Sequence, residues 1–215
     1  MNILIIGANG QIGTILSEKL QGSKHTPVAM VRKKQQVKNF DQKGIDTVLA
    51  DLEKDISHAF KGIDAVVFTA GSGADTSKSQ TKVIDENGAK KAIDQAVAES
   101  INRFIMVSAL MADSEPENWP DPMKHYYEAK SNADEYLRNS GIDHTILMPG
   151  RLTNEEGTGK VELSERINDV KGRSISRADV ASVIALLLDA DNTKNESLDL
   201  LDGETPIEEA VSEIG

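Results

Sequence analysis

The chain has 215 residues, of which 35 are acidic and 24 basic, so its formal net charge is −11. This length fits one domain with a sizeable core, and the charged fraction of 27% is near the globular average, which excludes wholesale disorder. The acidic balance argues against nucleic acid as the main partner, because neutralising phosphates requires a dense basic face.

Several classes of site are also excluded or disfavoured. The chain has no cysteine, which rules out disulfides and thiolate chemistry. The four histidines show no paired ligand spacing, so we expect no metal centre. No apolar run approaches the roughly 20 residues of a membrane span, and the first run is too short for a secretory signal. We therefore expect a cytoplasmic protein with a small-molecule substrate and no membrane partner.

Short apolar runs alternate with helical patterns along most of the chain. The runs that we expect to form strands cover residues 3–6, 28–31, 48–50, 65–68, 104–107 and 145–148. Between several of them, apolar residues recur at helical spacing, as in the segments near residues 89–97 and 123–138. Strands that alternate with helices predict an α/β fold, a doubly wound parallel sheet with helices on both faces.

The last part of the chain, residues 151–215, has a different pattern. It is rich in loop residues as far as Gly172 and then contains one clear helix, with apolar positions at 180, 183, 184, 187 and 188. This stretch is too short for a large second domain. We therefore expect a single domain over residues 1–215, with 151–215 as a small C-terminal cap on the substrate side.

Three glycines follow the first strand in the pattern G-x-x-G-x-x-G, directly before the first helix. The first permits a tight turn, the second lets a pyrophosphate approach backbone N–H groups, and the third allows close helix–strand packing. The helix N-terminus adds a positive dipole end. The alternative is a merely tight strand–helix turn. We expect a dinucleotide to bind here, at Gly7, Asn9, Gly10, Gln11, Ile12 and Gly13.

The end of the second strand bears on which dinucleotide binds. NAD-selective sites usually place an acidic residue about 20 positions beyond the glycine loop, whereas this strand runs into Arg32 and Lys33. A cation at this place can pair with a 2′-phosphate. We therefore expect NADP rather than NAD, with Arg32 as the anchor and Lys33 as support. The alternative is a solvated basic start to the next helix.

Candidate catalytic residues lie farther along the chain. Tyr126 and Lys130 are four residues apart, so they share a helix face. Ser108 follows the fifth strand, at the sheet edge where α/β folds bind ligands. A phenol with a reference pKa of about 10 needs a nearby cation to act near neutral pH. The pattern Y-x-x-x-K is weak on its own. Here it is strengthened by Ser108 and by the order of the strands and helices along the chain.

With these motifs in this order, the chain resembles the short-chain dehydrogenase/reductase superfamily, in particular its atypical and extended Rossmann-type members and small bacterial proteins similar to NAD-dependent epimerases and dehydratases. The resemblance implies that Tyr126 is the general acid or base. It also implies that Lys130 lowers the pKa of Tyr126 and binds the nicotinamide ribose, and that Ser108 orients the substrate oxygen.

The resemblance implies further cofactor contacts. Asp51 and Leu52 would hold the adenine, although Asp51 is equally suited to cap a helix. Small residues would lie beneath the ribose and pyrophosphate, and a Pro-Gly turn would lie beside the nicotinamide; these residues are Ala70, Gly71, Ser72, Pro149 and Gly150. Arg151 would bind an anionic substrate or else form a surface salt bridge.

One position departs from the family pattern. Extended members tend to carry Asn three residues before a helical glycine, and here Asp85 stands three residues before Gly88. Asp85 would contact ribose or be a solvated helix carboxylate. Ser176 and Asp179 also match a family segment, but S-x-x-D before an apolar run is a capping box, and we prefer that interpretation.

Three functions remain open at this point. The leading one is an NADP-dependent oxidoreductase that acts on a small carbonyl or alcohol. The alternatives are an NAD-dependent sugar epimerase or dehydratase and a non-enzymatic protein that senses NADP(H). The altered Asp85 position favours the sensor, whereas Tyr126 and Lys130 favour an enzyme. Relatives often form homodimers, but no residue here fixes an interface.

Overall fold

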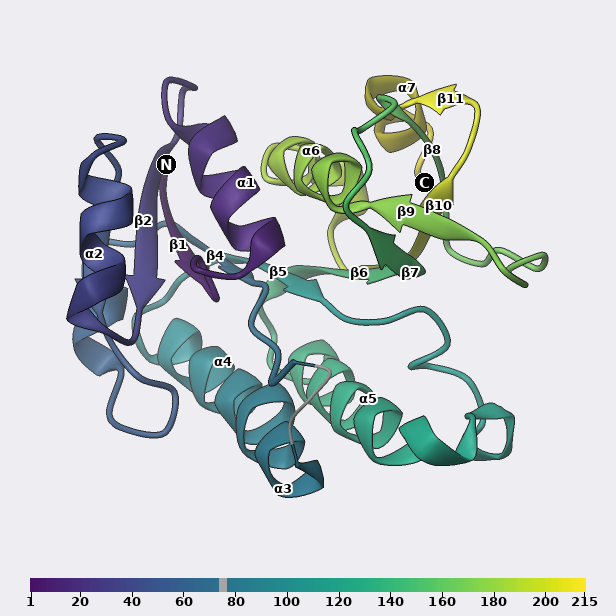
Figure 1. Ribbon diagram of the computed structural model, residues 1–215, viewed down its shortest axis with the longest axis horizontal. Helices are drawn as coiled ribbons and strands as arrows, with labels where there is room; N and C mark the ends of the chain where they lie inside the picture. Colours follow the sequence, from purple (N-terminus) through teal and green to yellow (C-terminus); the bar gives the residue numbers. More distant parts are fainter. Residues whose placement is uncertain (74–76) are drawn as a thin grey trace.

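The computed structural model describes residues 1–73 and 77–215. Within them, nine strands form a sheet in the order β11-β8-β10-β6-β5-β4-β1-β2-β3 (Figure 1). The first six strands pair in parallel and coincide with the six predicted runs. The order of these six strands is that of a doubly wound sheet. Their bounds are β1 (Asn2–Ile6), β2 (Thr26–Val31), β3 (Asp46–Leu49), β4 (Ala65–Phe68), β5 (Arg103–Val107) and β6 (Asp143–Pro149).

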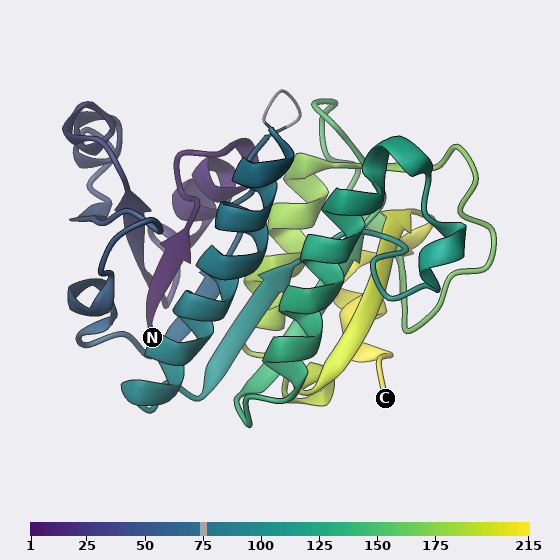
Figure 2. The same cartoon turned by 90° about the horizontal axis from the view of Figure 1, so that it is seen from below.

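Helices cover both faces of the sheet, which confirms the predicted α/β architecture. One layer contains α1 (Gln11–Leu20), α2 (Lys34–Asp41), α6 (Arg177–Leu187) and α7 (Ile207–Ser212). The opposite layer contains α4 (Ala89–Ala98) and α5 (Lys124–Arg138), which lie side by side in Figure 2. Short helical turns lie at Ser57–Phe60, Pro116–Asn118, Asp121–Met123 and Asp191–Thr193.

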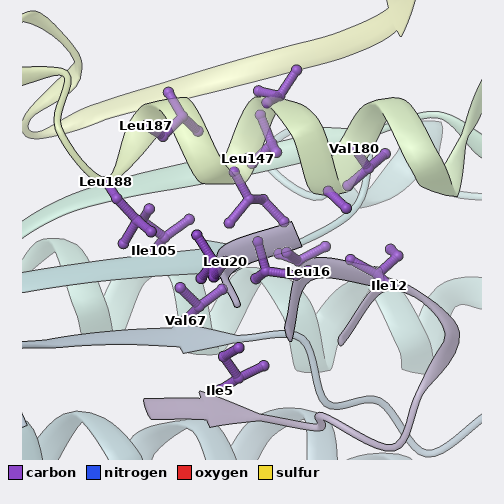
Figure 3. Packing of buried hydrophobic residues seen from close by; sticks show 14 of the residues in the cluster. Ile5, Ile12, Leu16, Leu20, Val67, Ile105, Leu147, Val180, Leu187 and Leu188 are labelled. Carbon is purple, nitrogen blue, oxygen red and sulfur yellow. The ribbon is translucent and has the colours of Figure 1, made fainter. Parts of the chain in front are cut away.

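Side chains of the central strands alternate between two cores. Ile3 and Ile5 pack under α1 and α6, whereas Leu4 and Ile6 pack under α4 and α5. Figure 3 shows the first of these cores, with Leu16 among the residues between the sheet and the helices. Because both faces of the strands are buried, their sequences are continuous apolar runs, and this is why they could be predicted.

Residues 151–215 do more than cap the sheet. They add β10 (Glu196–Asp202), which is parallel to β6, and then β8 (Lys160–Ser164) and β11 (Thr205–Pro206), which are antiparallel additions. A separate pair forms between β7 (Arg151–Thr153) and β9 (Ser174–Ser176). These strands carry acidic residues, among them the buried Asp199 of β10, so they lack the apolar runs that mark β1 to β6.

The helix after β4 begins with an irregular segment. It starts as α3 (Lys78–Thr81), continues as a π-helical turn over Lys82–Gly88, and runs directly into α4. A π-turn holds one residue more than an α-turn and is often found at functional sites. The buried residues at this turn include Asp85.

Two large side chains of the helical segments near residues 89–97 and 123–138 lie at the surface rather than in the core. Val97 is 49% exposed, and Tyr136 is 40% exposed with its hydroxyl donating to Asp94 Oδ1 at 2.6 Å. In both helices the residues that face the sheet include small ones, such as Ala96 and Ala133, so the helices pack closely there. The larger side chains of Val97 and Tyr136 lie at the edges of the helix faces that contact the sheet, so they remain exposed.

Candidate cofactor and active site

The glycine loop has little room for side chains at two positions. Gly7 has φ +89°, and a Cβ there would lie 2.6 Å from Ala70 N. A Cβ on Gly13 would lie 2.4 Å from the carbonyl oxygen of Gly7. The Gly10 N–H donates to that same carbonyl at 2.8 Å, which closes the turn. Gly10 precedes α1 and has no side chain to cap it, so the first turn of the helix presents backbone N–H groups.

A cleft of about 540 Å³ opens at the carboxyl ends of the strands beside this loop. It is lined by nine of the residues expected to bind the cofactor: Gly7, Asn9, Gly10, Arg32, Asp51, Leu52, Ala70, Gly71 and Ser72. The other expected cofactor residues are not among its lining residues: Gln11, Ile12, Gly13, Lys33, Lys130, Pro149 and Gly150. Residues that we did not predict complete the lining: Ile6, Met30, Val31, Gln36, Ala50, Thr69, Gln80 and Ile84.

Arg32 lies at the mouth of this cleft with an exposed side chain. The loop that carries it is held by Gln36, whose Oε1 accepts the N–H groups of Arg32 at 3.2 Å and of Lys33 at 2.9 Å. Gln36 stands three residues after Lys33, the cap of α2, and this capping-box spacing is the signal that could have revealed its role.

Asp51 and Leu52 form the far wall of the cleft. Asp51 Oδ1 accepts the N–H of Glu53 at 3.1 Å and so stabilises a local turn. No helix starts there, since the next helical turn begins at Ser57, so the helix-cap alternative is wrong. The side chain of Leu52 is mostly buried and packs against the Gly88 position.

The predicted catalytic residues are buried to different degrees. Ser108 and Lys130 are each 5% exposed, whereas Tyr126 is partly exposed. The Ser108 hydroxyl donates a short hydrogen bond to Oδ2 of Asp134, an acid that sequence reasoning missed. Asp134 is one helical turn beyond Lys130, so this spacing was the available signal.

Lys130 is held among protein groups. Its Nζ donates to the carbonyl oxygen of Val107 at 3.2 Å and lies 3.4 Å from Asp85 Oδ1. It also lies 5.8 Å from the ring centroid of Tyr126. Burial alone would lower the pKa of Lys130, but the neighbouring Tyr126, Asp85 and Asp134 outweigh it and raise the pKa. The ammonium is therefore kept charged beside the Tyr126 ring.

Asp85 connects the two parts of the site. It is 1% exposed, so the solvated-carboxylate alternative is wrong. Its Oδ2 accepts the backbone N–H of Ser72 at 2.9 Å, and Ser72 lines the cofactor cleft. One carboxylate thus joins the loop after β4 to Lys130 on α5.

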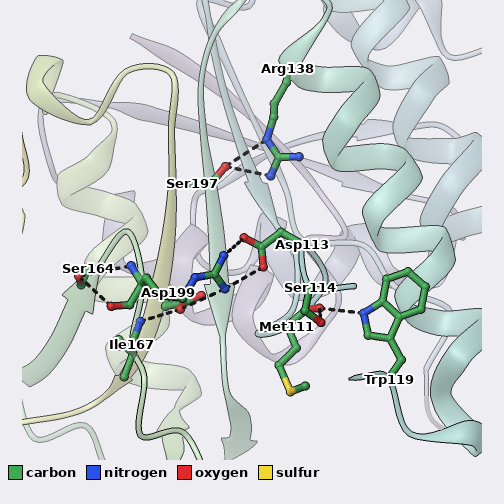
Figure 4. Close-up of polar contacts among 10 residues, drawn as sticks. Met111, Asp113, Ser114, Trp119, Arg138, Ser164, Ile167, Ser197 and Asp199 are labelled. Carbon is green, nitrogen blue, oxygen red and sulfur yellow. Dashed lines mark hydrogen bonds and ion pairs between the residues drawn. The ribbon is translucent and has the colours of Figure 1, made fainter. Parts of the chain in front are cut away.

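An aromatic group covers the start of α5. Tyr127 stacks on Trp119 with centroids 6.0 Å apart and meets Tyr126 edge-on at 5.5 Å. The Trp119 Nε1 donates to the carbonyl oxygen of Met111 at 2.9 Å (Figure 4). Trp119 therefore packs its loop down, and Tyr127 joins this packing.

An ion pair ties two loops together next to this group. Arg166 forms two hydrogen bonds with Asp113, at 2.5 and 3.1 Å (Figure 4). Its Nη1 also lies 4.0 Å from Asp199, which accepts the N–H of Ile167 at 2.9 Å. Burial raises the pKa of Asp199. The segment after β5 and the segment after β8 are held together in this way.

The residues after β6 have structural roles in this conformation. The strand extends as far as Pro149, and a Cβ on Gly150 would lie 2.3 Å from Leu201 Cδ2, so the glycine allows β10 to approach. Arg151 is exposed on β7.

Ser176 caps the start of α6 as expected, because its hydroxyl accepts the Asp179 N–H at 2.9 Å; of the predicted capping box, this is the bond that the structure contains. The Asp179 carboxylate also accepts the N–H groups of Thr158 and Gly159, each at 2.9 Å, and so fixes that loop. Ser176 is thus the cap and Asp179 the loop anchor, and the Ser176 hydroxyl joins them by donating to Asp179 Oδ2 at 2.9 Å.

In the part of the chain that the structure describes, no group of three or more acidic or histidine side chains is arranged to hold a metal ion. Across the same residues, no helix is both long enough and apolar enough to cross a membrane.

The glycine turn, the cleft at the carboxyl ends of the strands and the doubly wound sheet define a Rossmann-type dinucleotide-binding protein. The NAD(P)H-binding family model matches residues 7–191, and the chain belongs to this family. An uncharacterized sugar epimerase of Bacillus subtilis, YhfK, is 45% identical over 218 residues that cover all of both chains.

Two solved structures extend these similarities. A Bacillus halodurans protein named for the NAD-dependent epimerases/dehydratases matches with a TM-score of 0.94 and 46% identity, covering 98% of each chain. The oxidoreductase ylbE from Lactococcus lactis matches with a TM-score of 0.86 and 32% identity over 98% of this chain and 95% of the other. The family supports a nicotinamide cofactor for the cleft.

Proposed function

We propose that the protein is an NADP-dependent oxidoreductase that interconverts a small carbonyl compound and its alcohol. The observation that carries the NADP assignment is the exposed Arg32 side chain at the mouth of the cleft, at the end of β2. In NAD-selective sites an acidic residue near this place accepts hydrogen bonds from the ribose. A guanidinium presents a fork of donors that suits a phosphate instead.

The rest of the cleft fits the other parts of the cofactor. The backbone N–H groups at the start of α1 would hold the pyrophosphate, and Met30, Leu52 and Ile84 offer an apolar wall for the adenine. The nicotinamide ring, when bound, supplies or accepts a hydride. Tyr126 would donate a proton to the substrate oxygen or accept one from it, and the buried ammonium of Lys130 lies 5.8 Å from the centroid of its ring.

The oxidoreductase assignment is supported by the relative from Lactococcus lactis, which carries that name at 32% identity. The retained Ser108, Tyr126 and Lys130 are the residue types that acid–base chemistry at a carbonyl requires.

Calorimetric titration of NADPH and NADH into the wild type and Arg32→Glu tests the cofactor assignment. Charge-assisted hydrogen bonds contribute about 1.5–3 kcal/mol, so Arg32→Glu should weaken NADPH binding about 10- to 100-fold and leave NADH binding nearly unchanged. Lys33→Glu is the matched control and should have a smaller effect, because Lys33 does not line the cleft. Equal affinities of the wild type for both cofactors would contradict the proposal.

A second candidate is a sugar epimerase, which the name of the Bacillus subtilis relative favours. Such an enzyme returns its cofactor to the starting state in each turnover, so it consumes none. Against it, residues after β6 largely extend the sheet through β8, β10 and β11 rather than build a separate enclosing domain. Net oxidation of NADPH with small aldehydes and ketones separates the two functions. Tight NADPH binding without turnover of either substrate class would favour the sensor alternative.

A further inference from the structure

Ser108 and Asp134 form a buried pair for which the proposed reaction does not account. Ser108 follows β5, and Asp134 projects from α5 at 1% exposure. The serine hydroxyl donates to Asp134 Oδ2. The other carboxylate oxygen, Oδ1, is buried and accepts no hydrogen bond from the residues that the structure describes. A carboxylate buried in this way has an unmet demand for protons or donors.

The protonation state of this pair decides what Ser108 can offer to a substrate. A hydroxyl has one hydrogen and two lone pairs. While Asp134 is ionised, it accepts the only hydrogen of Ser108, and the serine can then only accept a hydrogen bond elsewhere. When Asp134 is neutral, its own proton can be donated to Ser108 Oγ, which frees the serine hydrogen for another acceptor.

We propose that Asp134 is a positioning residue that sets whether Ser108 donates or accepts a hydrogen bond at the substrate oxygen. The neutral acid prepares Ser108 to donate to a carbonyl, and the ionised acid prepares it to accept from an alcohol. Asp134 thereby sets which of the two, carbonyl or alcohol, the site binds more tightly at a given pH. This inference rests on the proposed oxidoreductase function.

The charged groups that act on Asp134 come from its own helix and from the segment after β5. Lys130 lies one turn before it and Arg138 one turn after it on α5, and Asp113 faces it from the segment after β5. Asp113 is itself neutralised by Arg166 from the segment after β8. Burial raises the pKa of Asp134 to about 7, although the Ser108 hydrogen bond and the charge of Lys130 act to lower it. Both forms of the pair are therefore populated near neutral pH.

The first test does not require activity. Carbon NMR of protein labelled at aspartate carboxyls, titrated with acid, should show Asp134 changing protonation near neutral pH. Ser108→Ala should raise that pKa further, because the ionised acid loses its donor. An Asp134 carboxyl that stays ionised down to the ordinary range of aspartate and ignores Ser108→Ala would overturn the pairing.

The second test measures both directions of turnover against pH. The probes are diacetyl with NADPH for reduction and acetoin with NADP for oxidation. The wild-type KM for diacetyl should rise about tenfold per pH unit above the pKa of Asp134, because Ser108 then no longer donates to the carbonyl. In Asp134→Asn the amide donates to Ser108 at every pH, so this rise should disappear and the KM for acetoin should increase about tenfold or more.

Asp94→Asn is the matched control, because Asp94 is an exposed acid on the neighbouring α4. It should keep the wild-type profile. Wild-type pH profiles of both KM values in Asp134→Asn, or an equal loss of turnover in both directions with both KM values unchanged, would overturn the positioning role. If the wild type turns over neither probe, the reductase function fails, and the NMR titration still decides whether Asp134 shares its proton with Ser108.

Discussion

The proposed cofactor half of the site, the cleft beside the glycine loop, and its proposed substrate half, around Ser108 and Lys130, are built in opposite ways. In the cofactor half, an open cleft is lined by the glycine loop, by apolar side chains such as Met30 and Leu52, and by polar side chains such as Arg32 and Gln80. In the substrate half, buried polar side chains bind one another: Ser108 with Asp134, and Lys130 with Asp85. The cofactor half leaves its hydrogen-bond donors free for a ligand. In the substrate half, most polar groups are already bonded to one another.

This difference indicates where each half is fragile. A cleft whose shape depends on close backbone packing is distorted when a glycine in it is replaced by a residue with a side chain. A network of buried charges fails when one member is removed, because its partner is then left uncompensated in the interior. Ser72 belongs to both halves, since it lines the cleft and donates its N–H to Asp85.

The largest expected effect lies in the substrate half. Lys130→Met keeps much of the side-chain length but leaves Asp85 charged and unpaired, so we expect the free energy of unfolding to fall by about 3–5 kcal/mol. Urea denaturation at neutral pH measures it. Adding Asp85→Asn should recover much of this loss, because the amide keeps an acceptor for the Ser72 N–H.

The exposed Lys24 supplies the comparison for this variant. Its side chain is 72% exposed in an ion pair with Asp189, and Lys24→Met should cost less than about 1 kcal/mol. If Lys130→Met costs no more than Lys24→Met, the buried charges do not stabilise this half as a network.

The next effect concerns the cofactor half. Gly7→Ala adds a left-handed residue whose Cβ would clash with Ala70 N, so we expect a loss of about 2–5 kcal/mol and of NADPH binding. Gly22→Ala has a similar φ of +85°, with no described heavy atom within 4 Å of its Cβ position. It should cost only the backbone strain of about 1–2 kcal/mol. Urea denaturation of both variants separates strain from clash, and equal losses would exclude the clash.

The last effect is a dependence of stability on pH, with a small change per pH unit, rather than a loss at one pH. The pKa of Asp134 is raised from 3.8 to about 7 in the folded protein. The folded state therefore holds a proton that the unfolded state has released between these values. The associated stability is present at low pH and is lost as pH rises toward 7, by at most about 1.4 kcal/mol per pH unit. The difference in unfolding free energy between wild type and Asp134→Asn should follow this course, whereas a constant difference would contradict it.

The cofactor half was largely predictable from the sequence. Continuous apolar runs mark strands buried on both faces, and Gly7, Gly10 and Gly13 mark the turn between β1 and α1. These signals are local, because backbone conformation depends on neighbouring residues. The nine predicted residues that line the cleft lie at the ends of strands or in the glycine turn.

The substrate half was less predictable, because its contacts join distant segments. Nothing near Asp134 in the sequence indicates that Ser108 lies against it, and Asp85 reads as an exposed helix residue until the fold places it beside Lys130. Strand β10 was not predicted for a related reason, because Asp199 interrupts its apolar run. In the fold, Asp199 is buried among apolar neighbours and accepts a backbone N–H. The spacing of residues along the chain does not reveal contacts between residues that are far apart in the sequence.

The π-helical turn over Lys82–Gly88 has a consequence for how this chain can change in length. Loss of one residue there would let the turn relax into regular α-helix and rotate the part before it by about 100°, one residue's share of a 3.6-residue turn. Asp85 would then no longer reach Ser72 and Lys130 together. In this segment a deletion is therefore more damaging than most substitutions. Natural variants should keep the length of the segment even where its residues differ.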